Sequence, residues 1–337
     1  THSRTGFRAI LVPLFSTLFF YLAYLAFKEI SAKKRVVFAV LSGMVLALGF
    51  YTYPSYRAII LIILALSAVI LLIKRDIFKN FWQEILIGII AASLIAAPLA
   101  IYFANHPWDF AGRAGYVSVF NKDMNQGNLL GTILNVAKKT FLMFFTQGDL
   151  NWRHNVSGYP MLNPWIAAFF AMGILYSLSI ILILFFRGKI FKKEFFDKWF
   201  IYLFLLLWFL GFLGPELMTV ESIPHGLRAI GVIPVSFLFA ALAIDVIWKE
   251  IESRLKLRHI PIILNCILVF IVGIDISYNY YLYFKVSAES PGFYYAYRSD
   301  LTIVSNYLNQ RNIKEKTYLI LDAYSVQTPE FLTASQN

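Results

Sequence analysis

The stretch Ala58–Ile73 reads AIILIILALSAVILLI and decides the class of fold, because it is apolar throughout and carries no charge. Arg57 precedes it, and Lys74 and Arg75 follow it directly. A helix that crosses the hydrocarbon core of a bilayer needs roughly 20 predominantly apolar residues. The run therefore predicts a transmembrane helix with basic residues at both ends.

Similar runs recur along the chain. Seven further apolar segments are predicted to span the membrane: 7–27, 36–53, 85–103, 165–186, 199–214, 229–248 and 260–284. Of all residues, 59% are hydrophobic and 15% are charged, whereas about 25% are charged in a typical soluble domain. The 32 Phe and 20 Tyr residues suit a protein that packs in lipid and anchors at its interfaces. The sequence thus predicts an all-α polytopic membrane protein with about eight transmembrane helices.

The positive charges predict the orientation. Four short connections, 28–35, 74–79, 187–198 and 249–258, hold 16 of the 30 Lys and Arg residues. Because positive charge marks the cytoplasmic side, we expect the N-terminus, the turn at Tyr56, the loops 104–164 and 214–228, and the C-terminal segment to face outward. The protein is then a multi-pass protein of the cell membrane. The formal charge of +11 needs no nucleic-acid partner, since no basic cluster is interleaved with aromatic residues.

Two segments outside the predicted spans have a structure of their own. Within the long outer loop, 129–145 has a helical pattern but is too short and too charged, at Lys138 and Lys139, to span comfortably. It is predicted to lie in the membrane interface. Near the C-terminus, 301–309 predicts an amphipathic helix and 316–322 a strand.

These patterns divide the chain into two parts. Residues 1–284 form the membrane module, and 285–337 form the start of a small α/β domain outside the membrane. The first residue is Thr1 and no basic leader precedes the first apolar run, so we interpret the chain as part of a longer protein.

The outward loops share isolated Arg and His residues beside aromatic and turn residues. The candidate substrate-binding residues are Arg4, Tyr53, Arg57, Arg153, His154, His225 and Arg228. An Arg guanidinium presents paired donors to phosphate oxygens, and Tyr rings can pack against a sugar or a prenyl chain. The pattern predicts a phosphate site at the outer interface. Arg and Tyr at helix ends also anchor to lipid headgroups, and this second interpretation stays open.

Two carboxylates have alternative interpretations. Asp149, in the loop after the interfacial helix, could act as a base, although a lone loop carboxylate more commonly caps a turn. Asp275 lies within a predicted span, where an ionisable residue can mark a transport pathway. With Asn279 nearby, hydrogen bonding inside the helix bundle is the simpler account of Asp275.

No metal is expected from the sequence. Glu221 and His225 are spaced as i and i+4, but Pro224 between them favours a hydrogen-bonded loop over a metal pair on one helix. The single Cys266 excludes an internal disulfide framework, and the spacing of Cys and His does not fit a zinc ribbon.

Four segments carry a resemblance to a known family. They are 3–8 (SRTGFR), 49–57 (GFYTYPSYR), 148–164 (GDLNWRHN through MLNP) and 223–231 (IPHGLRAIG). Together, over residues 1–283, they resemble bacterial GT-C glycosyltransferases related to aminoarabinose transferase and protein O-mannosyltransferase. The resemblance implies an enzyme that transfers a sugar from a polyprenyl-phosphate carrier to an acceptor of unidentified class on the outer face. It further implies that Arg4 and Arg57 bind the carrier phosphate, and that His154, His225 and Arg228 line the cavity.

The resemblance also implies the chemistry. A carboxylate takes the proton of the acceptor hydroxyl, cationic side chains stabilise the departing phosphate, and no cofactor or metal is required beyond the lipid-linked donor. The family's base is an acidic residue in the first outward loop. This sequence has no counterpart, so we expect the base upstream of Thr1 and the 337-residue chain alone to be inactive.

Other classes remain as alternatives. A transporter or flippase of a lipid-linked saccharide would share the basic outer cavity, but it should carry charged pairs at mid-membrane and an internal repeat, and neither is visible. A polymerase or ligase of surface polysaccharide would also have an outer loop with Arg and His. A non-catalytic scaffold would need no acidic outer loop.

Overall fold

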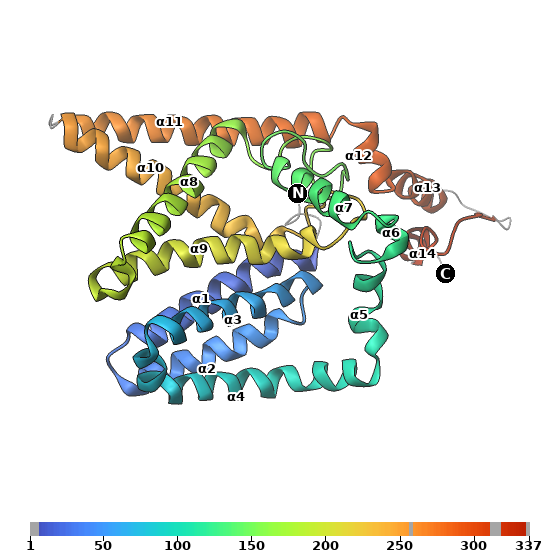
Figure 1. Ribbon diagram of the computed structural model, residues 1–337. Helices are drawn as coiled ribbons and strands as arrows, with labels where there is room; N and C mark the ends of the chain where they lie inside the picture. Colours follow the sequence, from blue (N-terminus) through green and yellow to red (C-terminus); the bar gives the residue numbers. More distant parts are fainter. Residues whose placement is uncertain (1–6, 256–258, 311–317, 335–337) are drawn as a thin grey trace.

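The computed structural model describes residues 7–255, 259–310 and 318–334. Over these residues the chain forms helices joined by turns, with no strand and with a single isolated bridge between Ser118 and Thr219. Figure 1 shows long helices lying side by side as a bundle, with shorter helices across one end. The prediction of an all-α fold is thereby confirmed for the described residues.

Seven helical segments of the described chain are long and apolar enough to cross a membrane. They are Arg8–Lys28, Pro54–Ile73, Arg75–Asn105, Pro164–Phe186, Glu194–Leu217, Ile230–Leu255 and Ile260–Ser287. The long helices within them are α1 (Leu11–Lys28), α3 (Ala58–Ile73), α4 (Arg75–Asn105), α8 (Pro164–Phe186), α9 (Lys193–Leu217), α10 (Ile233–Leu255) and α11 (Ile260–Tyr281). The chain is therefore a multi-pass membrane protein.

The predicted span 36–53 corresponds to α2 (Ala32–Gly49), which is the eighth long helix. Its 18 residues include Lys33, Lys34 and Arg35 near the start, so its uncharged part, 36–49, is shorter than a full span. It packs against α1 and α4. Arg35 Nε donates to Glu84 Oε1 of α4 at 2.8 Å, and this ion pair holds the two helices together at their charged ends. Eight spans thus remain a prediction, of which seven are supported by length and composition.

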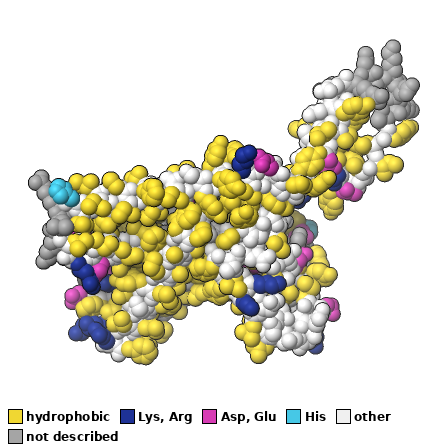
Figure 2. All heavy atoms as spheres, turned by 90° about the horizontal axis from the view of Figure 1, so that it is seen from above, with side chains coloured by type: hydrophobic (Ala, Val, Ile, Leu, Met, Phe, Trp, Pro, Cys, Tyr) yellow, Lys and Arg dark blue, Asp and Glu magenta, His cyan; other side chains and the backbone are white. Residues whose placement is uncertain are grey.

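The connections alternate between the two ends of the bundle. In Figure 1 the four basic connections all lie toward the left end, and Figure 2 shows a group of Lys and Arg side chains there beside an apolar bundle surface, with further Lys and Arg side chains elsewhere on the molecule. The beginning of α1, the α2–α3 turn and the α9–α10 loop lie at the opposite end. There, α5 (Pro107–Tyr116), α6 (Lys122–Asn125) and α7 (Leu129–Leu142) follow α4 and run across the end of the bundle. We call this the loop-bearing end.

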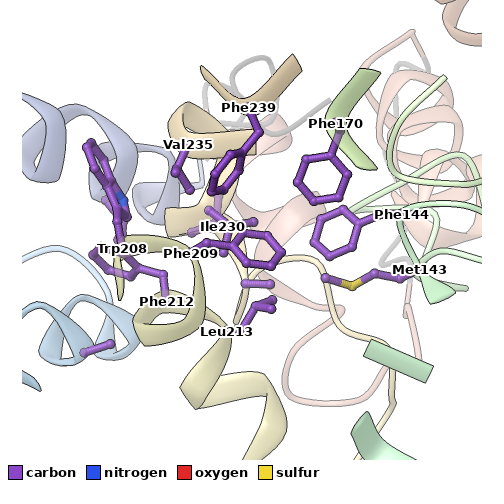
Figure 3. Packing of buried hydrophobic residues seen from close by; sticks show 14 of the residues in the cluster. Met143, Phe144, Phe170, Trp208, Phe209, Phe212, Leu213, Ile230, Val235 and Phe239 are labelled. Atoms are coloured by element: carbon purple, nitrogen blue, oxygen red, sulfur yellow. The ribbon is translucent and has the colours of Figure 1, made fainter. Parts of the chain in front are cut away.

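The predicted non-spanning helix 129–145 is present as α7, and the chain directly after it enters the core. Phe144 packs against Phe170 of α8 with ring centroids 5.2 Å apart, and Phe170 packs against Phe209 of α9 at 5.5 Å. Phe239 of α10 closes the group at 6.1 Å from Phe209 (Figure 3). Burial of four aromatic rings supplies much of the packing energy here. The long loop is therefore fixed to α8, α9 and α10 rather than lying loosely above them.

The backbones of α8 and α10 approach closely at Gly173. A Cβ atom placed on Gly173 would lie 1.9 Å from the carbonyl oxygen of Phe239. Small residues at such crossings let membrane helices pack at short distance. This crossing lies one turn from Phe170 and so belongs to the same core.

The C-terminal region is helical where it is described. The helix predicted at 301–309 is present as α13 (Ser299–Gln310), between α12 (Pro291–Ala296) and α14 (Gln327–Thr333). Of the strand predicted at 316–322, residues 316–317 lie outside the described residues, and 318–322 form no strand. A strand needs a neighbour to pair its backbone N–H and C=O groups, and no described segment provides one. The predicted α/β domain is thus not shown.

Candidate functional site

The carboxylate of Asp149 joins two loops at the loop-bearing end. Asp149 is 3% exposed. Its Oδ1 accepts from the backbone N–H of Asn151 at 2.8 Å, which is the turn-capping role expected of a loop carboxylate. Its Oδ2 accepts from His154 Nδ1 and from the backbone N–H of Gly226, both at 2.8 Å. The loop after α7 is thereby connected to the loop between α9 and α10.

Two histidines, His154 and His225, lie beside the carboxylate of Asp149. The rings of His154 and His225 have centroids 4.6 Å apart, and the ring of Phe7, just before α1, meets His154 edge-on at 5.8 Å. His225 Nδ1 is buried and has no hydrogen-bond partner among the described residues. We call Asp149, His154 and His225 the Asp–His–His cluster.

The electrostatics of the cluster follow from burial and hydrogen bonding. Burial alone would raise the pKa of Asp149, but the hydrogen bond from His154 and those from the backbone N–H groups of Asn151 and Gly226 hold this pKa below its usual range. Burial lowers the pKa of His225 to about 4, and nearby Arg228 adds to that effect while Asp149 opposes it. At neutral pH the cluster therefore holds an ionised carboxylate beside a neutral imidazole.

Arg228 is held by acidic and polar groups of its own loop. Its Nη1 donates to Thr219 Oγ1 at 3.0 Å and to the Glu221 carbonyl oxygen, and its Nη2 donates to Glu221 Oε2 at 3.2 Å. Glu216, at the end of α9, is fully buried and accepts from the backbone N–H of His225 at 2.8 Å, while its Oε2 lies 3.9 Å from Arg228 Nη1. The first role of Arg228 is therefore to fix the loop that presents His225.

Glu221 and His225 do not form a metal pair, as expected from the sequence. The Glu221 carboxylate pairs with Arg228, and the imidazole of His225 turns toward Asp149 and His154 instead. The hydrogen-bonded loop favoured by Pro224 is the arrangement present.

Arg57 lies over aromatic rings rather than on the cluster. Its guanidinium carbon is 4.1 Å from the ring centroid of Phe110 and 5.2 Å from that of Phe103, and its Nη1 donates to the Phe110 carbonyl oxygen at 2.7 Å. These contacts attach α5 to the start of α3. Tyr53 packs against the main hydrophobic core at the same turn.

Arg153 points away from the cluster, toward the C-terminal region. Its Nε donates to the Ala296 carbonyl oxygen at 2.6 Å, and Tyr297 Oη donates to the Arg153 carbonyl oxygen at 3.3 Å. A Cβ on Gly292 would lie 2.2 Å from Trp152 Nε1, so α12 packs closely on this loop. Arg4 lies outside the described residues.

Asp275 bonds within the bundle. Its Oδ1 accepts from Asn163 Nδ2 at 2.6 Å and from Trp165 Nε1 at 3.0 Å, and its Oδ2 accepts from Asn279 Nδ2 at 3.0 Å. These bonds join the beginning of α8 to α11, which is the simpler of its two predicted roles.

The convergence of Asp149 with His154 and His225 was not predicted. In the sequence Asp149 is a lone carboxylate, and the two histidines belong to separate loops. Their donor atoms, one carboxylate oxygen and two imidazole nitrogens, lie within 4.8 Å of one another. Such a group can hold a metal ion or relay a proton.

Comparison with known proteins adds no further identification. No protein-family model matches this chain, no curated protein matches it, and no solved structure matches it.

Proposed function

We propose that this protein is a membrane glycosyltransferase that moves a sugar from a polyprenyl-phosphate carrier to an acceptor on the outer face of the membrane. The observation that carries the proposal is the meeting of the segments that resemble GT-C enzymes. The ring of Phe7 lies on His154, and Asp149 accepts from the backbone of Gly226. The turn Pro54–Arg57 packs against Ile230–Val232. Segments chosen by sequence alone thus share one end of the bundle.

The distribution of charge supports the outer face. The basic connections lie opposite to the loop-bearing end, where Asp149 joins the loop after α7 to the loop between α9 and α10. With positive charge on the cytoplasmic side, the cluster faces outward, where a lipid-linked sugar donor would present its phosphate at the membrane surface.

The protonation state of Asp149 bears on which group acts as the base. Asp149 is a poor base, because both of its oxygens accept hydrogen bonds and its pKa is low. The removal of the proton from the acceptor hydroxyl is therefore assigned to another carboxylate, which the family resemblance locates in an N-terminal outward loop. The acceptor oxygen then bonds to the anomeric carbon as the bond from that carbon to the phosphate oxygen breaks and its electron pair leaves with the phosphate.

Arg57 supports the phosphate end of this scheme. It makes a single hydrogen bond to the described residues, so its remaining N–H donors can serve phosphate oxygens while the rings of Phe103 and Phe110 hold the guanidinium. Donors of this kind stabilise a departing phosphate, since they are oriented before the reaction starts.

The test is transfer by the complete gene product in detergent or liposomes, supplied with a radiolabelled polyprenyl-phosphate sugar. We expect release of the carrier phosphate together with labelled acceptor or free sugar. His154→Gln should lower turnover, whereas His106→Gln, at the exposed end of α4, should not.

Other outcomes separate the alternative classes. Saturable donor binding without turnover, combined with movement of the label across a liposome membrane, would establish a flippase instead. Absence of donor binding would refute both the transferase and the flippase.

A further inference from the structure

We propose that Asp149, His154 and His225 bind one divalent transition-metal ion, with Zn²⁺ as the best-matched ion. The proposal goes beyond transferase activity and departs from the expectation that no metal takes part. It rests on the convergence of three donor atoms and on the buried Nδ1 of His225, which has no hydrogen-bond partner in the part of the chain that the structure describes.

The donor set selects the class of metal. Two imidazole nitrogens with one carboxylate oxygen are typical of Zn²⁺ and other first-row transition ions, whereas Ca²⁺ and Mg²⁺ prefer oxygen ligands. A set of three protein ligands also leaves a coordination position for water or for an oxygen of a ligand.

The geometry requires only side-chain adjustment. The donor atoms lie within 4.8 Å of one another, while ligands about 2.1 Å from a tetrahedral Zn²⁺ are about 3.4 Å apart. Asp149 Oδ2 and His154 Nδ1 are already 2.8 Å apart and hydrogen-bonded. Metal binding exchanges this hydrogen bond for metal–ligand bonds, and the ring of His225 turns toward the same point.

The backbone around the cluster holds the ligands in place. The N–H groups of Asn151 and Gly226 fix the Asp149 carboxylate, and the fully buried Glu216 fixes the peptide of His225. Hydrogen bonds of this kind to ligating groups orient them and raise metal affinity. The fold therefore supplies an outer layer of hydrogen bonds to the ligands as well as the ligands themselves.

A purely structural role is the competing explanation. In that case Asp149 would only connect two loops, and His154 would be its partner. That account gives no function to the buried Nδ1 of His225, which costs free energy when it is left without a partner. A metal ion bound through Nδ1 would satisfy this nitrogen.

The experiment uses the untagged complete protein, purified after chelation and then titrated with Zn²⁺ in competition with a chromophoric chelator. We expect one Zn²⁺ per chain. His225→Gln and Asp149→Asn should each weaken binding by about 100-fold or more, since loss of a hydrogen-bonding partner of a ligand already costs about 10–100-fold. His106→Gln is the matched control for adventitious imidazole binding and should keep the wild-type affinity.

Two results would overturn the proposal. One is a wild-type protein that binds no saturable equivalent of Zn²⁺, and the other is a folded His225→Gln variant with unchanged affinity for Zn²⁺. If the variants do not fold, the visible absorption spectrum of the wild-type protein with added Co²⁺ is the deciding measurement. Visible absorption bands of a low-coordinate nitrogen- and oxygen-ligated Co²⁺ support the site, and their absence refutes it.

Metal binding is measured without donor or acceptor, so its outcome is separate from that of the transferase assay. A protein that transfers sugar but binds no metal would refute only the metal site. A protein that binds Zn²⁺ without transferring sugar would refute only the proposed function.

Discussion

Replacing Gly173 with alanine should loosen the crossing of α8 and α10. The added Cβ would lie 1.9 Å from the carbonyl oxygen of Phe239, whereas ordinary contact begins at 3.4 Å. The obstacle is backbone, so it cannot rotate away, and the helices must separate by about 1.5 Å. Overpacking of this kind costs about 1–3 kcal/mol, and the higher helix propensity of alanine offsets up to about 1 kcal/mol of it. Because a contact of 1.9 Å with backbone is severe, the cost lies near the upper end of this range, and we expect a net loss of about 2 kcal/mol in the free energy of unfolding.

The assay is unfolding in mixed micelles of increasing dodecyl sulfate content, followed by tryptophan fluorescence. Gly273→Ala in α11 is the matched control, because a Cβ there meets nothing within 4 Å. The control should keep wild-type stability or gain up to about 1 kcal/mol. A Gly173→Ala protein as stable as the Gly273→Ala protein would show that the helices are not in contact at Gly173.

Three further predictions concern the loop-bearing end. The pKa of His225 is about 4 in the folded protein and near 6.5 in the unfolded chain. Between about pH 6.5 and pH 4 the unfolded chain therefore binds a proton at His225 that the folded protein does not bind. The free energy of unfolding of chelator-treated protein should therefore fall by on the order of 3 kcal/mol as the pH drops from 7 to 4; a His225→Gln protein with the same pH slope would contradict this. Asp275→Ala leaves Trp165 Nε1 without its acceptor and should cost about 1–3 kcal/mol in the same micelle assay; an unchanged midpoint would refute that contact. Arg57→Ala removes the anchor of α5 at Phe110, so amide hydrogen exchange in 107–116 should accelerate, and unaltered exchange there would count against the anchor.

The spans could be predicted from sequence because hydrophobic length determines them. The helix predicted at Ala58–Ile73 has those same bounds in α3, since basic residues mark both of its ends. In contrast, α4 begins at Arg75, ten residues before the predicted start at 85. Its first turns carry Asp76, Lys79 and Glu84, so hydropathy does not reveal them as helix. The ion pair of Glu84 with Arg35, which compensates for that charge, joins residues far apart in the chain.

The site could be predicted only in part, for a different reason. His154 and His225 were selected as residues of outward loops, and both lie in the cluster. Arg57 and Arg153 were selected by the same pattern, yet they hold α5 and α12. A pattern of isolated charges beside aromatic residues does not distinguish an arginine that binds a ligand from one that binds a carbonyl oxygen. The sequence did not predict that Asp149 joins two loops, because its partner Gly226 contributes only a backbone N–H, and no sequence pattern indicates such a donor.

The bond between Asp149 and Gly226 also has a consequence for biosynthesis. The two residues are 77 positions apart, and at roughly 5–20 residues per second the ribosome needs about 4–15 s to proceed from one to the other. In the orientation that the positive charges predict, the loop that carries Asp149 crosses the membrane before α8 and α9 are inserted, and its carboxylate then stays in water during that interval. The cluster is completed only after α9 and the following loop have been made, so a delay in inserting α9 would leave the loop unfinished for longer.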